Sequence, residues 1–217
     1  MKIFKYILIY LWFMIFLASP YYASGDNVTA QSHIEYSADE YMQIEGFTLY
    51  AKVFYTPEKV RKDQDLPGLP RITILRKDKG VVCVLIPEEK KYLETPLDES
   101  DKINAEFVRG FENNATVRSV LGEEMLNGME TTKSAITIKD WRGGEFEGLM
   151  WQSKNGIIVK LETVTKARGS SHRFMLELKN IRQHRQNPLL FEVPHGYSKI
   201  AYSGINDVIK NTLSKAQ

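Results

Sequence analysis

Three strands are predicted by residues 71–94, RITILRKDKGVVCVLIPEEKKYLE. Arg71–Arg76 and Val81–Ile86 are rich in the β-branched residues of paired strands. Gly80 lies between them and suits the positive φ of a tight turn. A proline ends the second strand because it cannot donate to a strand ladder. Lys91–Glu94 is then placed to pair as the third strand.

The second strand of this hairpin is apolar on both faces. Alternate side chains point to opposite faces, and both sets are apolar: Val82, Val84 and Ile86 on one face, Val81, Cys83 and Leu85 on the other. A strand with one face in water would alternate between apolar and polar residues. Either both faces of the hairpin are therefore covered, or one face lines an apolar cavity.

A short basic and apolar segment opens the chain. Lys2 and Lys5 precede the apolar run Tyr6–Ala18, and small residues follow it. This pattern is typical of a secretory signal peptide, here residues 1–25 or slightly shorter, with cleavage after Ala23 or Gly25. A retained membrane anchor is the alternative, but the run is shorter than the roughly 20 residues that span a bilayer. The sequence thus predicts an exported, periplasmic protein.

The mature chain, residues 26–217, is long enough for one core and is predicted to form a single domain. The full chain carries 29 basic and 27 acidic side chains. Loss of Lys2 and Lys5 with the leader leaves 27 of each. This balance gives no indication of nucleic acid or an anionic membrane as a partner. The one cysteine, Cys83, cannot form an internal disulfide.

Further strands are predicted on both sides of the hairpin. Phe47–Thr56 is the clearest, because its apolar side chains recur at every second position. Val60–Asp63 has the composition of a short exposed strand. Asn127-Gly128 and Asn155-Gly156 are typical hairpin turns, and Leu189–Val193 is predicted as the last short strand. The total is about ten strands, all antiparallel.

Two helices are predicted to accompany the strands. Ser100 can cap the start of a helix, and Ile103–Phe111 supplies its apolar face. Ile205–Leu213 is also amphipathic. The fold class is therefore mainly β with α: a strongly curved antiparallel sheet with helices that can cover one face.

No catalytic constellation is recognisable. The histidines lack the spacing of a metal site and are scattered: His33, His172, His184 and His195. Cys83 is expected to be a buried, inert thiol rather than a nucleophile, because nothing nearby in the sequence would lower its pKa. Acidic pairs such as Glu88-Glu89 are expected to face solvent rather than hold a metal. We therefore expect no enzymatic activity, no metal and no cofactor.

The strongest remaining signal is the number of apolar and aromatic residues on strand faces. Plain core is one explanation, and a pocket for an acyl chain or an apolar peptide is the other. Both fit the alternation of period two. The residues that would line such a cavity are Leu49, Val53, Tyr55, Ile72, Ile74, Cys83, Leu85, Leu149, Trp151, Phe174 and Leu176.

Several segments carry a family resemblance when they are taken in order. They are Pro57–Arg61, Gly80–Pro87, Gly122–Glu124 with Asn127-Gly128, Trp151–Gly156 with Lys160, and Phe191–Tyr197. In this order and spacing they resemble the LolA/LolB-like superfamily of periplasmic lipoprotein carriers and outer-membrane lipoprotein-sorting proteins, over nearly all of the mature chain. Cys83 is a departure, since the family often has an aromatic residue there. A smaller residue would make the cavity locally wider.

The resemblance implies a LolA-like half-barrel sheet around an apolar cavity, with Ile103–Phe111 or Ile205–Leu213 as the lid helix. It also implies a periplasmic carrier of lipid or of lipoprotein acyl chains for outer-membrane sorting. The implied partners are this cargo and an inner-membrane transporter or an outer-membrane acceptor. Two other functions stay open: a sensor or interaction module of the same fold, and a hydrolase that uses His172 or His195.

Overall fold

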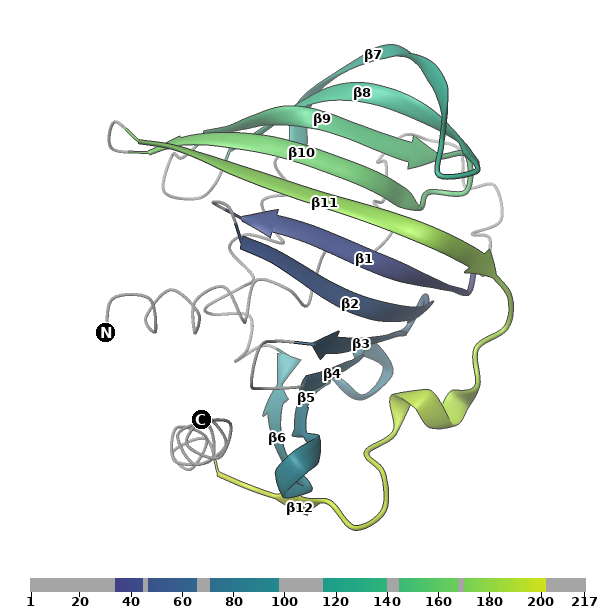
Figure 1. The fold of residues 1–217 in the computed structure, drawn as a ribbon, viewed down its shortest axis with the longest axis vertical. Coiled ribbons are helices and arrows are strands. Elements are labelled where there is room, and N and C mark those ends of the chain that lie inside the picture. Colours follow the sequence, from purple (N-terminus) through teal and green to yellow (C-terminus); the bar gives the residue numbers. More distant parts are fainter. Residues whose placement is uncertain are drawn as a thin grey trace.

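The computed structural model describes residues 34–44, 47–65, 71–97, 115–139, 145–167 and 170–201. In these ranges the chain forms one twelve-stranded sheet (Figure 1). The predicted signal peptide and both predicted helices lie outside the described residues. The first six strands are β1 (Tyr36–Ile44), β2 (Phe47–Thr56), β3 (Lys59–Asp65), β4 (Arg71–Arg76), β5 (Val81–Ile86) and β6 (Lys91–Pro96).

The remaining strands are β7 (Ala115–Leu126), β8 (Met129–Lys139), β9 (Glu145–Ser153), β10 (Ile158–Ala167), β11 (Ser170–Gln183) and the two-residue β12 (Ser198–Lys199). Short 3-10 helices in the described ranges are η1 (Lys77–Lys79), η2 (Pro87–Glu89) and η3 (Pro188–Phe191).

The sheet consists of two meanders that meet in its middle. Its strand order is β12-β6-β5-β4-β3-β2-β1-β11-β10-β9-β8-β7. Strands that are consecutive in the chain pair within β1–β6 and within β7–β11, and β1 joins the meanders by pairing antiparallel with β11. Figure 1 shows the sheet bending, so that β8–β11 are seen broadside while β4–β6 stand nearly edge-on. This is an open, curved sheet, as a half-barrel requires.

The local predictions for the hairpin and for β2 are confirmed. β4 and β5 pair antiparallel with Thr73 opposite Val84, and Gly80 has a φ of 63° at the turn. β2 has the predicted bounds and alternates in burial along most of its length. Asn127 and Gly128 have φ values of 50° and 79°, the pair of positive angles that a tight hairpin turn needs.

The strand predicted at Val60–Asp63 is confirmed, but the prediction that it is exposed is wrong. These residues belong to β3, which lies between β2 and β4 and extends from Lys59 to Asp65. Val60 and Lys62 are buried. Lys62 is buried because an acidic side chain on β1 neutralises it, a long-range contact that composition does not report.

The prediction of a last strand at Leu189–Val193 is also wrong. Pro188 opens η3 instead, and the Asn187 side chain caps this turn by accepting a hydrogen bond from the Leu189 backbone N–H at 3.0 Å. The last strand that the structure describes is β12, which pairs with β6 in parallel. Over the described ranges the sheet therefore has twelve strands rather than about ten, and it is not wholly antiparallel.

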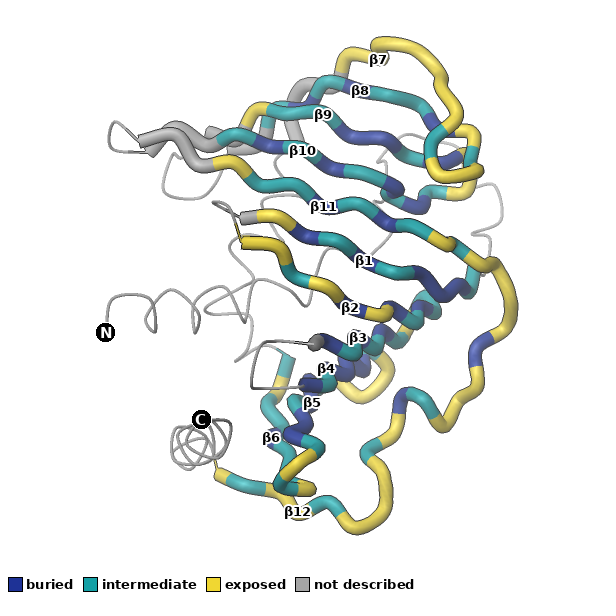
Figure 2. Tube along the Cα trace, in the orientation of Figure 1, coloured by how far each residue is buried: buried dark blue, intermediate teal, exposed yellow. Residues whose placement is uncertain are grey.

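Both faces of the sheet carry buried apolar side chains. We call the face that bears Ala38, Met42 and Val53 the core face, because the larger cluster of buried residues lies on it. The opposite face bears Ile74, Cys83 and Leu85. We call it the strap face, because side chains of residues 188–197, the strap, pack on it. Figure 2 shows burial concentrated in β3–β5 and along the middle of β8–β11, with β7 largely exposed.

Candidate functional site

A continuous apolar row crosses the core face and joins the two meanders. Met150, Leu161, Leu176, Met42 and Leu49 lie opposite one another on β9, β10, β11, β1 and β2. All but Leu49 are buried. The row extends over five adjacent strands, so the core face is one apolar surface and not two separate ones.

A second row, parallel to the first, changes from apolar to polar as it crosses the sheet. Leu178, Glu40, Ala51, Gln64 and Arg71 lie opposite one another from β11 to β4. All of them are buried. Buried polar side chains on an apolar face need partners, because desolvation without a hydrogen bond is costly.

Glu40 has its partner within a polar patch of the core face, which consists of Glu40, Lys62, Gln64 and Arg71. The Lys62 Nζ donates to both carboxylate oxygens of Glu40, at 2.8 and 3.0 Å. Each side chain is only 1% exposed. Removal of either partner would leave the other charge buried and unpaired, so the pair is a closed, neutral unit.

Arg71 and Gln64 have no such partners. They lie opposite each other on β4 and β3 and are 5% and 4% exposed. The Nε and Nη2 of Arg71 and the Oε1 of Gln64 make no hydrogen bond with any residue that the structure describes. Burial lowers the pKa of the Arg71 guanidinium to about 10, which leaves it charged at neutral pH.

Two stacked tyrosines border this patch. The rings of Tyr36 and Tyr55 lie 4.9 Å apart and are inclined by 21°. Burial raises the pKa of the Tyr36 hydroxyl, and the neighbouring Tyr55 and Glu40 raise it further. Tyr36 is therefore neutral at physiological pH and acts here as an apolar surface with a polar tip.

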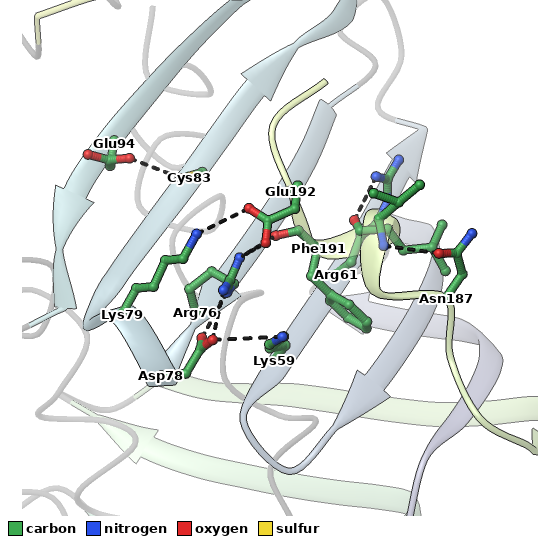
Figure 3. A network of polar contacts seen from close by, with 12 residues as sticks. Lys59, Arg61, Arg76, Asp78, Lys79, Cys83, Glu94, Asn187, Phe191 and Glu192 are labelled. Atoms are coloured by element: carbon green, nitrogen blue, oxygen red, sulfur yellow. Dashed lines mark hydrogen bonds and ion pairs between the residues drawn. The ribbon is translucent and has the colours of Figure 1, made fainter. Parts of the chain in front are cut away.

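Two arginines hold the strap against the strap face of the sheet (Figure 3). Arg61 donates to the Leu190 backbone oxygen at 2.9 Å. Arg76 donates to the Phe191 backbone oxygen at 3.1 Å and to the Glu192 carboxylate at 2.5 Å. The Phe191 side chain is buried on this face together with residues of β4 and β5.

Each of these arginines also holds a carboxylate two residues further along the chain. Arg76 donates from Nε and Nη2 to the two oxygens of Asp78, at 2.8 and 2.7 Å. Arg61 does the same to Asp63, at 2.6 and 3.2 Å. The hydrogen bond from Arg76 is the main reason that the pKa of Asp78 lies below its usual range.

Cys83 lies under the strap, in surroundings that keep its thiol protonated. It is buried beside Ile74, Leu85 and Phe191, and its thiol lies 3.8 Å from the Glu94 carboxylate. Burial raises the pKa of the thiol to about 11, and the negative charge of Glu94 adds to the effect. The prediction of a buried thiol is confirmed.

The predicted lining residues do not lie on one face. Leu49, Val53, Tyr55, Phe174 and Leu176 are on or against the core-face cluster, whereas Ile72, Ile74, Cys83 and Leu85 belong to the strap-face cluster. Cys83 therefore packs under the strap and does not widen a surface shared with the first group. The alternation of period two separates the faces of each strand, but it does not say which faces coincide between strands.

Trp151 and Leu149 lie on the side of β9 opposite the core face, since Met150 between them is a core-face residue. The Trp151 ring lies between two ammonium groups, with Lys133 Nζ at 4.9 Å and Lys160 Nζ at 5.0 Å from its centroid. Its indole N–H donates to Glu124. This arrangement anchors the ring in a polar setting rather than in an apolar lining.

The described residues bring together no group of three or more His, Cys, Asp or Glu side chains that could hold a metal. His184 is exposed, with its Nε2 3.3 Å from the Ser37 hydroxyl, and His195 is exposed as well. His33 lies outside the described residues, and so does the side chain of His172. No helix in the described ranges is both long and apolar enough to cross a membrane.

Comparison with known proteins places the chain in a structural class. No family model matches the sequence, and no curated protein matches it either. The fold is similar to that of solved structures with 10–11% sequence identity to this chain.

Two of these matches show the fold most directly. An uncharacterized conserved protein from Thermus thermophilus matches with a TM-score of 0.53 and 11% identity, over 78% of this chain and 91% of that one. MucB matches with a TM-score of 0.50 and 10% identity, over 76% of this chain, and the chain spans only 59% of the length of MucB.

A LolA superfamily protein from Nitrosomonas europaea also matches, with a TM-score of 0.36 and 9% identity, over 76% of this chain and 91% of that one. The shared fold rests on the two stronger matches.

Proposed function

We propose that this protein is a LolA-like carrier that binds lipid, or the acyl chains of lipoproteins, against its core face without converting them chemically. The observation that supports this most is the apolar row from Met150 to Leu49, which is continuous across both meanders. An acyl chain gains about 0.8 kcal/mol for each methylene that it buries. An open sheet recovers only part of this, which suits a carrier that must release its cargo.

The experiment is to isolate the mature protein under mild conditions and to identify bound lipid by mass spectrometry. A fluorescent fatty acid then measures binding to the delipidated protein. Leu49→Trp places a bulkier side chain in the apolar row of the core face and should weaken probe binding. Ile72→Trp is the matched control, because the same side chain then lies on the strap face and should leave probe binding unchanged. Circular dichroism checks that both variants fold. Absence of co-purified lipid together with absence of probe binding would refute a carrier.

The proposal includes export to the periplasm and a role in outer-membrane sorting. It is supported by the sequence of residues 1–25 and by the superfamily resemblance. Protein recovered from the periplasm should begin at Ser24 or Asp26, as read by N-terminal sequencing. A mature protein that retains Lys2 and Lys5 would contradict cleavage. In this proposal the acceptor of the cargo lies at the outer membrane.

A second candidate function is an interaction module, and the exposed strand β7 favours it. β7 lies at one end of the sheet order, and Val120, Leu121 and Met125 are exposed on it. Strands at sheet edges are templates for pairing with another chain. MucB, which shares the fold, is known in complex with MucA(peri). A Val120→Lys variant that keeps lipid binding but loses a protein captured from periplasmic extract would favour this function.

A further inference from the structure

The Nε and Nη2 of an arginine lie on one edge of the guanidinium and can hold both oxygens of one anion. Arg61 and Arg76 use this edge to hold Asp63 and Asp78. In Arg71 the same two nitrogens are buried and make no hydrogen bond with any described residue.

The sequence explains why Arg71 differs from the other two arginines. Arg61 and Arg76 are each followed two positions later by an aspartate on the same strand face or at the turn. The equivalent position after Arg71 is Thr73, a neutral residue. Arg71 therefore has no carboxylate of its own strand to hold.

The neighbours of Arg71 do not compensate for its charge either. Glu40 already accepts from Lys62 with both oxygens. Gln64, directly across the strand pair, is neutral. Within the described part of the patch, one positive charge is thus left without a counter-charge. Burial of an uncompensated guanidinium is costly, so the free protein keeps Arg71 at the expense of stability.

The position of Arg71 connects this charge with the apolar surface. Arg71 is in the row that ends at Leu178, directly beside the apolar row through Leu176. An amphipathic molecule could lie with its chain along the apolar row and its charged end at β4. The Gln64 amide lies opposite Arg71 and could add one bond. It would accept from a hydroxyl of the head group or, turned over, donate its NH₂ to an oxygen.

We propose that the Nε–Nη2 edge of Arg71 binds the oxyanion of an amphipathic ligand, a carboxylate or a phosphate, whose acyl chain lies on the core face. This inference rests on the proposed carrier function and makes it selective. Neutral lipids of equal chain length bind more weakly because they leave the guanidinium unpaired.

The test uses the delipidated mature protein and two probes of equal chain length, cis-parinaric acid and its methyl ester. The acid should bind at least about tenfold more tightly than the ester, in line with one charge-assisted bidentate contact. Arg71→Met should remove this preference by weakening the acid and leaving the ester unchanged. Arg182→Met, which removes an exposed arginine of β11, is the matched control and should keep the preference.

Each outcome separates this inference from the carrier function. Equal binding of acid and ester by the unaltered protein would overturn the anion site and leave the carrier standing, without reliance on any variant. A preference that survives Arg71→Met would overturn the role of Arg71. Failure of both probes would overturn both proposals. A phosphatidic acid tests the phosphate head group. Inorganic phosphate should compete only weakly, and competition as strong as that of the lipid would show a free-anion site instead.

Discussion

Replacement of Phe191 by alanine should release the strap from the sheet while the sheet itself stays folded. Phe191 is 2% exposed and packs with Ile74, Cys83 and Leu85. Truncation of a buried phenylalanine costs about 3–5 kcal/mol. Because Phe191 is on η3, outside the sheet, this loss falls first on the docking of the strap. The other anchors, Arg61 and Arg76, donate charge-assisted hydrogen bonds to backbone oxygens and to the partly exposed Glu192, worth about 1.5–3 kcal/mol each.

Cys83 is a natural reporter of this release, since it is the one cysteine of the chain and is buried under the strap. A neutral thiol reagent reacts with it only when the strap opens. A loss of about 3 kcal/mol in docking raises the open population, and hence the labelling rate, by about 100-fold or more. The rate should also rise with pH, because the thiolate is the nucleophile, and the closed state keeps the thiol protonated since burial raises its pKa to about 11.

The assay compares labelling rates of three proteins by mass spectrometry: unaltered, Phe191→Ala and Leu189→Ala. Leu189 is on the same turn but 75% exposed, so its truncation should leave the rate unchanged. Urea titration measures global unfolding in parallel. Labelling of Phe191→Ala that rises only as far as global unfolding predicts would refute local release. Fast labelling of the unaltered protein would contradict the claim that the strap covers the Cys83 thiol.

Three further predictions concern the sheet, and urea denaturation of each variant checks them. Lys62→Met should lower the free energy of unfolding by about 3–5 kcal/mol, because it leaves the buried Glu40 charge unpaired. The double replacement with Glu40→Leu should recover most of this loss. Equal losses in the single and the double variant would contradict the coupling. Gly148→Ala should destabilise strongly, since an added Cβ would lie 1.9 Å from the Glu162 backbone oxygen, and a stability change below about 1 kcal/mol would be inconsistent with that approach. Arg71→Met should stabilise the free protein by about 1–3 kcal/mol, because it removes a buried, unpaired charge, and a loss of stability would indicate a structural partner for Arg71.

The sequence was sufficient for the elements whose signals are local. The hairpin of β4 and β5 followed from Gly80 and two β-branched runs, and β2 followed from strict alternation. Burial on both faces of β5 also followed correctly, because no half-exposed strand is apolar throughout. The sequence did not predict what covers one of these faces. The strap is held there by the turn at Pro188 with its Asn187 cap and by hydrogen bonds from Arg61 and Arg76.

The candidate site was less predictable, because it depends on register between strands. Lys62, Gln64 and Arg71 have the composition of exposed strand ends, and only the pairing of β3 with β2 and with β4 places them on the core face. Ile74 and Val53 have the same apolar character in sequence but lie on opposite faces. A shift of one residue in register exchanges the faces of a strand, so side-chain type alone could not sort them.

The junction of β1 with β11 has a consequence for how the chain reaches its native state. It brings together the first and the last long strands that the structure describes, while the other long strands pair with neighbours in the chain. Local pairs form early and distant pairs late, because closing a long loop costs entropy first. Each meander can thus form alone with one open edge in what becomes the middle of the sheet. During synthesis β1 has β2 as its only long neighbour until β11 emerges, and this interval is when the nascent chain is most exposed to aggregation.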